Sequence, residues 1–119
     1  MRGFIAQVIM HELGIMTEAI RMAVEAAGSR RVRKMTLRVG VLSGVAPDAL
    51  RFAFEVAAHG TVVAGAVLEI ETVAAVCWCA NCHQEFESGN LLDACPRCND
   101  LSGDLRRGRG LEIAAVELI

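Results

Sequence analysis

Two Cys-x-x-Cys turns in one short stretch constrain the fold of this chain more than any other feature of its sequence. The turns are Cys79-Ala-Asn-Cys82 and Cys95-Pro-Arg-Cys98. Two intervening residues allow both sulfurs of a turn to point toward one ion, and two such turns supply the four thiolates that tetrahedral zinc prefers. Four protein ligands leave no position for water. The spacing therefore predicts a structural zinc site whose binding energy helps this segment to fold.

Other uses of these cysteines fit the pattern less well. Disulfide scaffolds of secreted proteins spread their cysteines along the chain, whereas all five here lie between residues 77 and 98. Iron of the rubredoxin kind and a thioredoxin-like redox pair are the alternatives, although a redox pair needs only one turn. Cys77 lies two residues before Cys79, and the two would face the same side if the preceding strand continues through them. We expect it to be a spare buried thiol, with a competing ligand role as the alternative.

The remainder of the chain has the periodicities of two helices and three strands. Apolar residues recur at helical spacing over residues 12–27, and Gly28 then ends the pattern. Pro47 suits the first turn of a second helix that runs to about His59. Alternating apolar residues predict three strands, over residues 35–42, 66–73 and 111–119.

The position of the last strand indicates the domain organisation. Residues 111–119 are too apolar to remain in water, and the cysteine segment offers them little core. We therefore expect this strand to return to the sheet of the first two strands. The predicted fold is α+β: a small sheet of about three strands packed with two helices, plus an inserted zinc-ribbon-like subdomain. The predicted domains are an α/β domain of residues 1–76 and 107–119, and a zinc-binding domain of residues 77–106.

Composition excludes several classes of function. The chain has 119 residues with net charge −2 and a pI near 5.9, which does not favour nucleic acid as a partner. No apolar stretch is long enough to span a bilayer, and no signal-peptide pattern opens the chain, so we expect a cytoplasmic protein without a membrane partner. We find no nucleophile beside a base and no phosphate-binding glycine loop, so we do not expect an enzyme.

The segment Met10-His11-Glu12-Leu13 is weak evidence by its chemistry, since a lone histidine before a helix is usually a surface residue. The segment nevertheless resembles the opening of the HypA and HybF family of nickel chaperones. Further motifs of this family follow in the same order along the chain. They are Val39-Gly40, Asp48, Phe54-Glu55, the two Cys-x-x-Cys turns with Pro96, and a closing strand with Glu112 and Glu117.

The resemblance implies a metallochaperone that carries Ni2+ for nickel-iron hydrogenase and holds a structural Zn2+. Nickel would be bound by the His11 imidazole and by backbone nitrogens of Met10 and Glu12, a nitrogen set that Ni(II) accepts. The carboxylates of Glu12 and Asp48 would be auxiliary groups, although Asp48 also suits a helix start. The implied partners are a HypB-type GTPase and the hydrogenase large-subunit precursor, with the chain a monomer or weak homodimer. The alternative is a zinc-ribbon module that binds protein or nucleic acid without nickel.

The chain departs from the family pattern at its beginning. Family members normally begin at the methionine of Met-His-Glu, where the terminal amine often joins the nickel ligands, but residues 1–9 precede Met10 here. Three explanations are open: Met10 is the true first residue, the segment is native and forms an extra edge strand, or the segment was added for expression. We favour the first, because an exposed apolar stretch over residues 4–9 would promote association.

Overall fold

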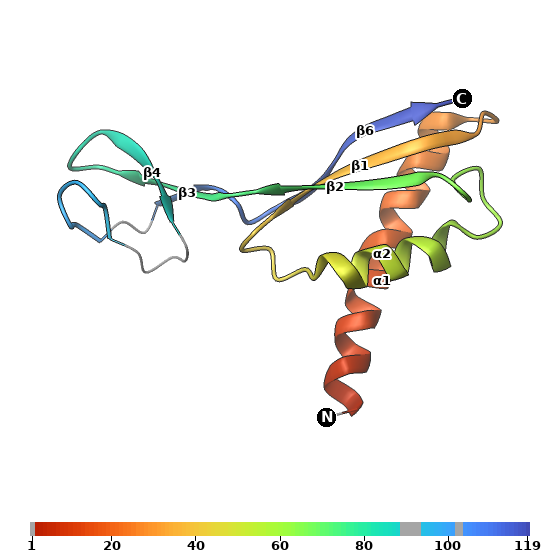
Figure 1. Cartoon of the computed structure of the whole chain (residues 1–119), viewed down its shortest axis with the longest axis horizontal. Helices are drawn as coiled ribbons and strands as arrows, with labels where there is room; N and C mark the ends of the chain where they lie inside the picture. Colours follow the sequence, from red (N-terminus) through yellow and green to blue (C-terminus); the bar gives the residue numbers. More distant parts are fainter. Residues whose placement is uncertain (1, 89–93, 102–103) are drawn as a thin grey trace. The chain divides into compact units, whose positions relative to one another are not determined.

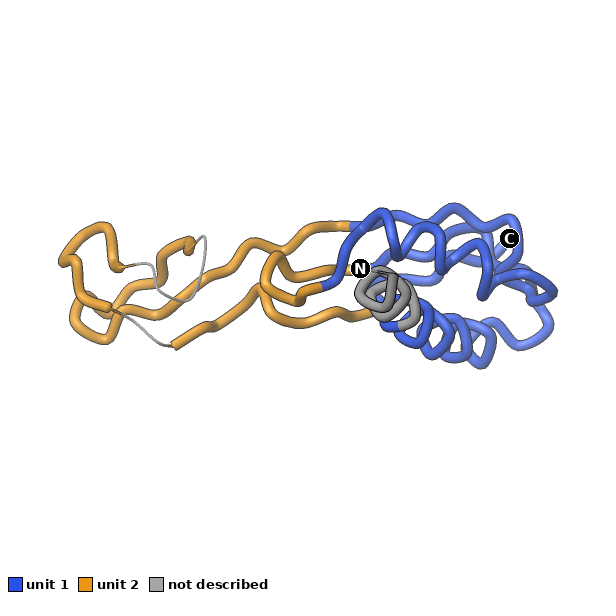
Figure 2. The backbone as a smooth tube through the Cα atoms, turned by 90° about the horizontal axis from the view of Figure 1, so that it is seen from below, with its two compact units in different colours: residues 1–37, 45–70, 113–119 blue, residues 38–44, 71–112 orange. Residues whose placement is uncertain are grey.

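The structure is a computed structural model that describes residues 2–88, 94–101 and 104–119, with side chains described from His11 onward. It divides into two compact units, coloured separately in Figure 2. Unit 1 holds residues 1–37, 45–70 and 113–119, and unit 2 holds residues 38–44 and 71–112. The domain boundaries expected from the sequence stay a prediction. No helix in the described part of the chain is long and apolar enough to cross a membrane.

The first helix, α1, runs from Arg2 to Ala27 and packs against α2 (Figure 1). Gly28 ends it as predicted, with φ +64° and its N–H donating to the Val24 carbonyl. The expected start at residue 12 is wrong, and the edge strand that was one of three explanations for residues 1–9 is not formed, because α1 begins at Arg2. Residues 2–11 contain no proline, and they include good helix formers such as Ala6 and Gln7. No residue there prevents the helix from beginning well before Glu12.

The second helix and the three strands of the first sheet confirm the prediction to within a few residues. Strand β1 covers Val32–Gly40, α2 covers Pro47–Ala58, β2 covers Val67–Val73 and β6 covers Leu111–Leu118. The strand order is β2-β1-β6, so the last strand does return to the first sheet. Fold class and the two-helix, three-strand arrangement are therefore as expected.

The core of unit 1 is made of apolar side chains from both helices and the sheet. Met16 of α1, Met35 and Leu37 of β1 and Leu50 of α2 are fully buried. Met35 and Leu37 are two residues apart on β1, so one face of that strand lies in the core. Helix α2 adds Ala53, Phe54 and Ala58, which lie on the same buried stripe of the helix as Leu50.

Unit 2 contains three strands that the sequence did not predict. Strand β3 covers Ala75–Cys79, β4 covers Gln84–Ser88 and β5 covers Asp104–Arg107, in the order β4-β3-β5. Both neighbours pair with β3 in antiparallel fashion. Alternate residues of β3 are buried, namely Ala75, Cys77 and Cys79.

Two glycines allow the backbones of unit 2 to approach closely. A Cβ on Gly40 would lie 2.2 Å from the carbonyl oxygen of Gly108. Gly108 itself has φ +105°, and a Cβ there would lie 2.5 Å from the Cα of Ala75. The N–H groups of Gly40 and Leu42 donate to the carbonyls of Gly110 and Gly108. Only residues without a side chain fit this crossing.

Candidate metal sites

The two Cys-x-x-Cys turns adopt similar local conformations. The first follows β3, where Cys79 pairs with Gln84 across the β3–β4 hairpin. In the second, the Cys95 N–H donates to the Asp100 carbonyl and the Asn99 N–H donates to the Cys95 carbonyl. The residue after each turn is left-handed, with φ +54° at His83 and +62° at Asn99. Histidine and asparagine tolerate this conformation better than most residues, which lets both chains bend away after their second sulfur.

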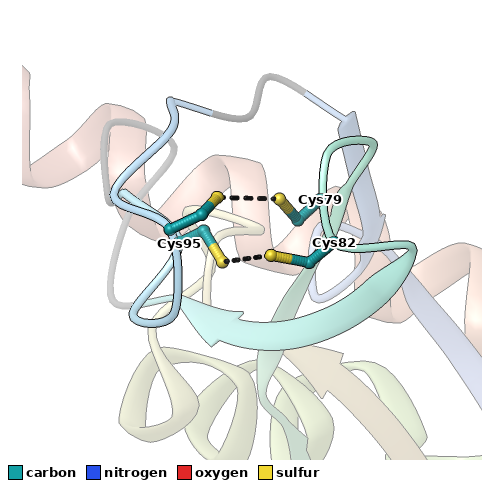
Figure 3. A group of neighbouring side chains, drawn as sticks. Cys79, Cys82 and Cys95 are labelled. Atoms are coloured by element: carbon teal, nitrogen blue, oxygen red, sulfur yellow. Dashed lines mark hydrogen bonds between the residues drawn. The ribbon is translucent and has the colours of Figure 1, made fainter.

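The four sulfurs of these turns converge on one point. The Cys79 and Cys98 sulfurs are 3.5 Å apart, and those of Cys82 and Cys95 are 4.0 Å apart (Figure 3). All four ligand atoms lie within 4.8 Å of one another. Zinc–sulfur bonds of about 2.3 Å in a tetrahedron place sulfurs about 3.8 Å apart. The sulfur set therefore fits a tetrahedral four-thiolate ion, and the turns form the zinc-ribbon-like group expected from the sequence.

The surroundings of Cys82, Cys95 and Cys98 shift the pKa values of these three thiols in different directions. The Asn81 side chain and the Asp100 backbone lower the pKa of Cys98 to about 6. The backbone N–H of Cys98 lowers the pKa of Cys95. The hydrogen bond with the Cys98 sulfur, together with burial, raises the pKa of Cys82 to about 12. The second turn thus offers thiolates, the form that binds metals, more readily than Cys82 does.

Cys77 lies in the core of unit 2 and outside the four-sulfur group. Its side chain is fully buried and pairs across the sheet with Phe86 and Leu105. Phe86 is the only buried aromatic side chain of the cluster that Cys77 forms with Cys79 and Cys95. Cys77 therefore occupies a packing position on the inner face of β3.

The outer face of β3 carries a contact that sequence reasoning missed. The guanidinium of Arg106 lies 5.1 Å from the centre of the Trp78 ring, and the His83 ring meets Trp78 edge-on at 6.5 Å. Arg106 also pairs with Asp104 at 3.2 Å. No spacing signal in the sequence indicates these contacts, because they join three separate strands or turns of the sheet.

The second candidate site lies on α1, at His11 and Glu12. The His11 side chain is 61% exposed, whereas that of Glu12 is only 1% exposed. His11 Nδ1 lies 3.5 Å from Glu12 Oε1. Glu12 Oε2 is buried and has no hydrogen-bond partner among the described residues. Buried carboxylate oxygens in proteins usually accept a hydrogen bond or lie beside a cation, and the described residues supply no hydrogen bond to this one.

The structure does not join Met10 and Asp48, the other two residues expected at the nickel site, to His11 and Glu12 through any described side-chain contact. Met10 lies within α1, and its side chain is outside the described part of the structure. Asp48 is exposed in the first turn of α2, directly after Pro47. No ion pair or hydrogen bond among the described residues joins Asp48 to His11 or Glu12. The structure thus brings His11 and Glu12 together, and it places Asp48 at a helix start.

This arrangement of two helices, small sheets and a four-cysteine group matches that of two solved structures. The solution structure titled as the Ni metallochaperone HypA from Helicobacter pylori aligns with a TM-score of 0.66, covering 91% of this chain and 97% of that one at 18% identity. A second solution structure, of HypA protein, aligns with a TM-score of 0.70 at 20% identity, covering 92% and 97% of the two chains. At these identities the likeness shows the fold alone.

Sequence comparison identifies the family. The model described as "Hydrogenase/urease nickel incorporation, metallochaperone, hypA" matches residues 10–118. Hydrogenase maturation factor HypA of Picosynechococcus sp. is 42% identical over 113 residues, covering 92% of this chain and all of that protein. The HypA of Chloroflexus aurantiacus is 45% identical over 112 residues, covering 91% and 98%. The chain belongs to the HypA family of nickel metallochaperones for hydrogenase maturation.

Proposed function

We propose that this protein binds Ni(II) at His11 and Glu12 of α1 and delivers it during maturation of nickel-iron hydrogenase. The observation that carries this proposal is the buried Glu12 carboxylate, whose Oε2 has no partner among the described residues. A carboxylate in that position is costly unless a cation or a donor compensates it. Nickel bound at His11 would bring a cation next to this carboxylate.

The exposed imidazole of His11 supports the same proposal. It is accessible to an incoming ion, and it lies beside the Glu12 carboxylate. In the proposed ligand set, His11 supplies the imidazole, Met10 and Glu12 supply backbone nitrogens, and Asp48 supplies an auxiliary carboxylate. Amide N–H groups within an α-helix donate to carbonyls four residues earlier. Binding through the Met10 and Glu12 nitrogens therefore requires the helix to unwind there.

We further propose that Cys79, Cys82, Cys95 and Cys98 hold a structural zinc ion. The sulfur separations given above support a tetrahedral site. Bound zinc would supply folding energy to unit 2 and no open coordination position for catalysis. We place the protein in the cytoplasm, as a carrier and not an enzyme, with a HypB-type GTPase and the hydrogenase large-subunit precursor as partners. A zinc-ribbon module without nickel function is disfavoured, because the family match extends from residue 10 to residue 118.

A nickel titration of zinc-loaded protein tests the proposal. Two forms are compared, one beginning at Met1 and one at Met10, and the visible absorption of planar Ni(II) reports the nitrogen ligand set. One nickel per chain is expected for the Met10 form. The His11→Ala variant should lose it, and Glu12→Gln, which keeps the shape but removes the charge, should weaken it. Met22→Ser is the matched control, since Met22 is an exposed residue of the same helix.

The outcomes separate the possible ligand sets. Equal binding by both forms would show that the terminal amine is dispensable. Binding by the Met10 form alone would show that the working chain begins at Met10, where the terminal amine or the freed amide nitrogens can reach the ion. Stoichiometric binding that survives His11→Ala, or no specific binding in either form, would refute the nickel site at α1.

A further inference from the structure

Gly14 is a glycine inside a helix where the surrounding fold does not require one. It lies within α1, which runs from Arg2 to Ala27, and it is exposed to solvent. A Cβ added at Gly14 would meet no atom within 4 Å. After proline, glycine is the residue that least favours a helix interior. Close packing therefore does not explain the glycine, and its presence weakens α1 directly after the His11 and Glu12 site.

Thr17 weakens the same turn of α1 in a second way. Its hydroxyl donates to the Leu13 carbonyl at 2.7 Å. In an α-helix that carbonyl is also the acceptor of the Thr17 backbone N–H, so the side chain competes with the backbone for it. Such back-bonding by threonine slightly destabilises helices and often bends them. The turn of residues 13–17 therefore contains two features that weaken the helix.

The part of α1 after Gly14 is held more firmly. Arg21 donates to Glu18 at 3.1 Å and to Glu25 at 2.8 Å, two charge pairs at helical spacing. Every buried apolar side chain that the structure describes in α1 also lies after Gly14, namely Met16, Ala19, Ile20, Ala23 and Ala27. The apolar core of unit 1 thus anchors the helix on one side of Gly14, and the proposed nickel ligands lie on the other.

Gly14 suits the beginning of a helix better than the interior of one. The N-cap residue, which directly precedes the first helical residue, has a non-helical backbone, and glycine is strongly preferred over alanine there. In a helix that began at Ile15, Gly14 would be the N-cap residue, and its carbonyl would accept the N–H of Glu18. Such a helix would keep all the buried apolar side chains and both charge pairs of the anchored part.

We propose that α1 breaks at Gly14 when nickel binds, so that the turn of residues 10–14 unwinds and the helix continues from Ile15 to Ala27. This inference rests on the proposed ligand set, because the backbone nitrogens of Met10 and Glu12 leave their helical hydrogen bonds only if this turn opens. Gly14 is then a positioning residue. It does not touch the ion, but it lowers the free energy needed to release the nitrogens that do.

Nickel affinities of the zinc-loaded chain beginning at Met1, measured in competition with a chelator, test the proposal. Gly14→Ala strengthens the long helix and removes a favourable N-cap from the short one, so it should weaken nickel binding about tenfold. Gly14→Ser adds a side chain of similar size, but serine is a good N-cap. Its affinity should therefore stay within about threefold of the parent chain. If Gly14 were needed only for its small size, alanine and serine would act alike.

Ala26→Gly is the matched control, because it puts the opposite substitution at an exposed position of the same helix, beyond the break. It should weaken α1 and leave the nickel affinity unchanged. Far-UV circular dichroism and zinc stoichiometry check that each variant is folded, and the visible absorption of planar Ni(II) checks that the ligand set is the same.

Hydrogen exchange of the parent chain locates the break. The first four N–H groups at a helix start have no partner within the helix, so nickel should remove amide protection through Thr17 and leave it from Glu18 onward. Protection that persists at residues 14–17 in the nickel-bound chain would overturn the break.

The affinities separate the break from the ligand set. A Gly14→Ala variant that binds nickel as tightly as the parent chain, or a Gly14→Ser variant as weak as Gly14→Ala, would overturn the break while the site at His11 stands. Nickel binding that survives His11→Ala, or a parent chain that binds no nickel, would overturn the ligand set and the break together.

Discussion

The two compact units of this protein differ in the side chains that form their buried interiors. The fully buried side chains of unit 1 are mostly large and apolar: Met16, Met35, Leu37, Leu50 and Val63. The buried cluster of unit 2 consists of Cys77, Cys79, Phe86 and Cys95. Burial of apolar surface can stabilise the first unit, but one aromatic ring and three thiols bury too little to do so in the second. We therefore expect the stability of the second unit to depend on what its thiols bind.

The largest expected effect is that of removing zinc. A structural zinc site contributes about 10 kcal/mol or more to folding, far more than the small cluster of unit 2. We expect a chelator to abolish amide-exchange protection in β3, β4 and β5, while α1, α2 and the buried part of β1 stay protected. Hydrogen-exchange mass spectrometry with peptides from each unit measures this directly.

Cysteine variants provide the control for that experiment. Cys79→Ser should lose zinc and reproduce the effect of the chelator. Cys77→Ser should keep one zinc per chain, because Cys77 lies outside the four-sulfur group. If the chelator unfolded both units together, the contrast between an apolar unit and a metal-dependent unit would be wrong.

The next largest effect is expected in the apolar core of unit 1. Leu37 is completely buried in β1. Leu37→Ala leaves a cavity and should lower the free energy of unfolding by about 3 kcal/mol. Thermal unfolding followed by the helical circular dichroism signal measures the loss, and zinc stoichiometry should stay at one.

Val67→Ala is the matched comparison in the same sheet. Val67 is 60% exposed on β2, so its truncation should change stability by less than about 0.5 kcal/mol. Equal losses in the two variants would contradict the assignment of the core to the inner face of the sheet.

The same contrast explains what the sequence could and could not predict. Ligand spacing is local, so the two Cys-x-x-Cys turns could be located from the sequence, and Gly28 and Pro47 mark helix ends by their own chemistry. Strand β3 was missed because its buried positions are occupied by Cys77 and Cys79, which do not count as an apolar alternation. In unit 1, by contrast, Leu37 and its neighbours on β1 alternate clearly.

The site on α1 was predictable only in part. The family resemblance pointed to His11 and Glu12, but periodicity placed Glu12 at the start of a helix. In the structure, α1 already begins at Arg2, because no proline before Glu12 interrupts the helix. Glu12 therefore lies inside the helix, and its side chain is buried. The burial of Glu12 is a result of tertiary packing, and no local sequence pattern reports such packing.

Smaller changes in the free energy of unfolding, of opposite sign, are expected from alanine substitutions at two glycines, one in each unit. Gly40→Ala would place a Cβ 2.2 Å from a backbone oxygen in unit 2, and the forced backbone shift should cost about 2 kcal/mol. Gly14→Ala in α1 meets no atom within 4 Å, and it should instead stabilise the helix by about 1 kcal/mol. Chemical denaturation of both variants checks the opposite signs. A stabilised Gly40→Ala variant would show that the strands of unit 2 do not cross closely there.

The smallest effect concerns the left-handed residue after the second turn. Asn99 has φ +62°, a conformation that glycine adopts freely and that alanine resists by about 1 kcal/mol. Folding of unit 2 is expected to be coupled to zinc, so this strain should appear as weaker metal binding. Asn99→Ala should lower zinc affinity about fivefold in competition with a chelator, whereas Asn99→Gly should match or exceed the parent chain. If Asn99→Ala bound zinc as tightly as the parent chain, folding of this turn would not be coupled to metal binding. Unit 2 would then resemble unit 1, which folds without a metal.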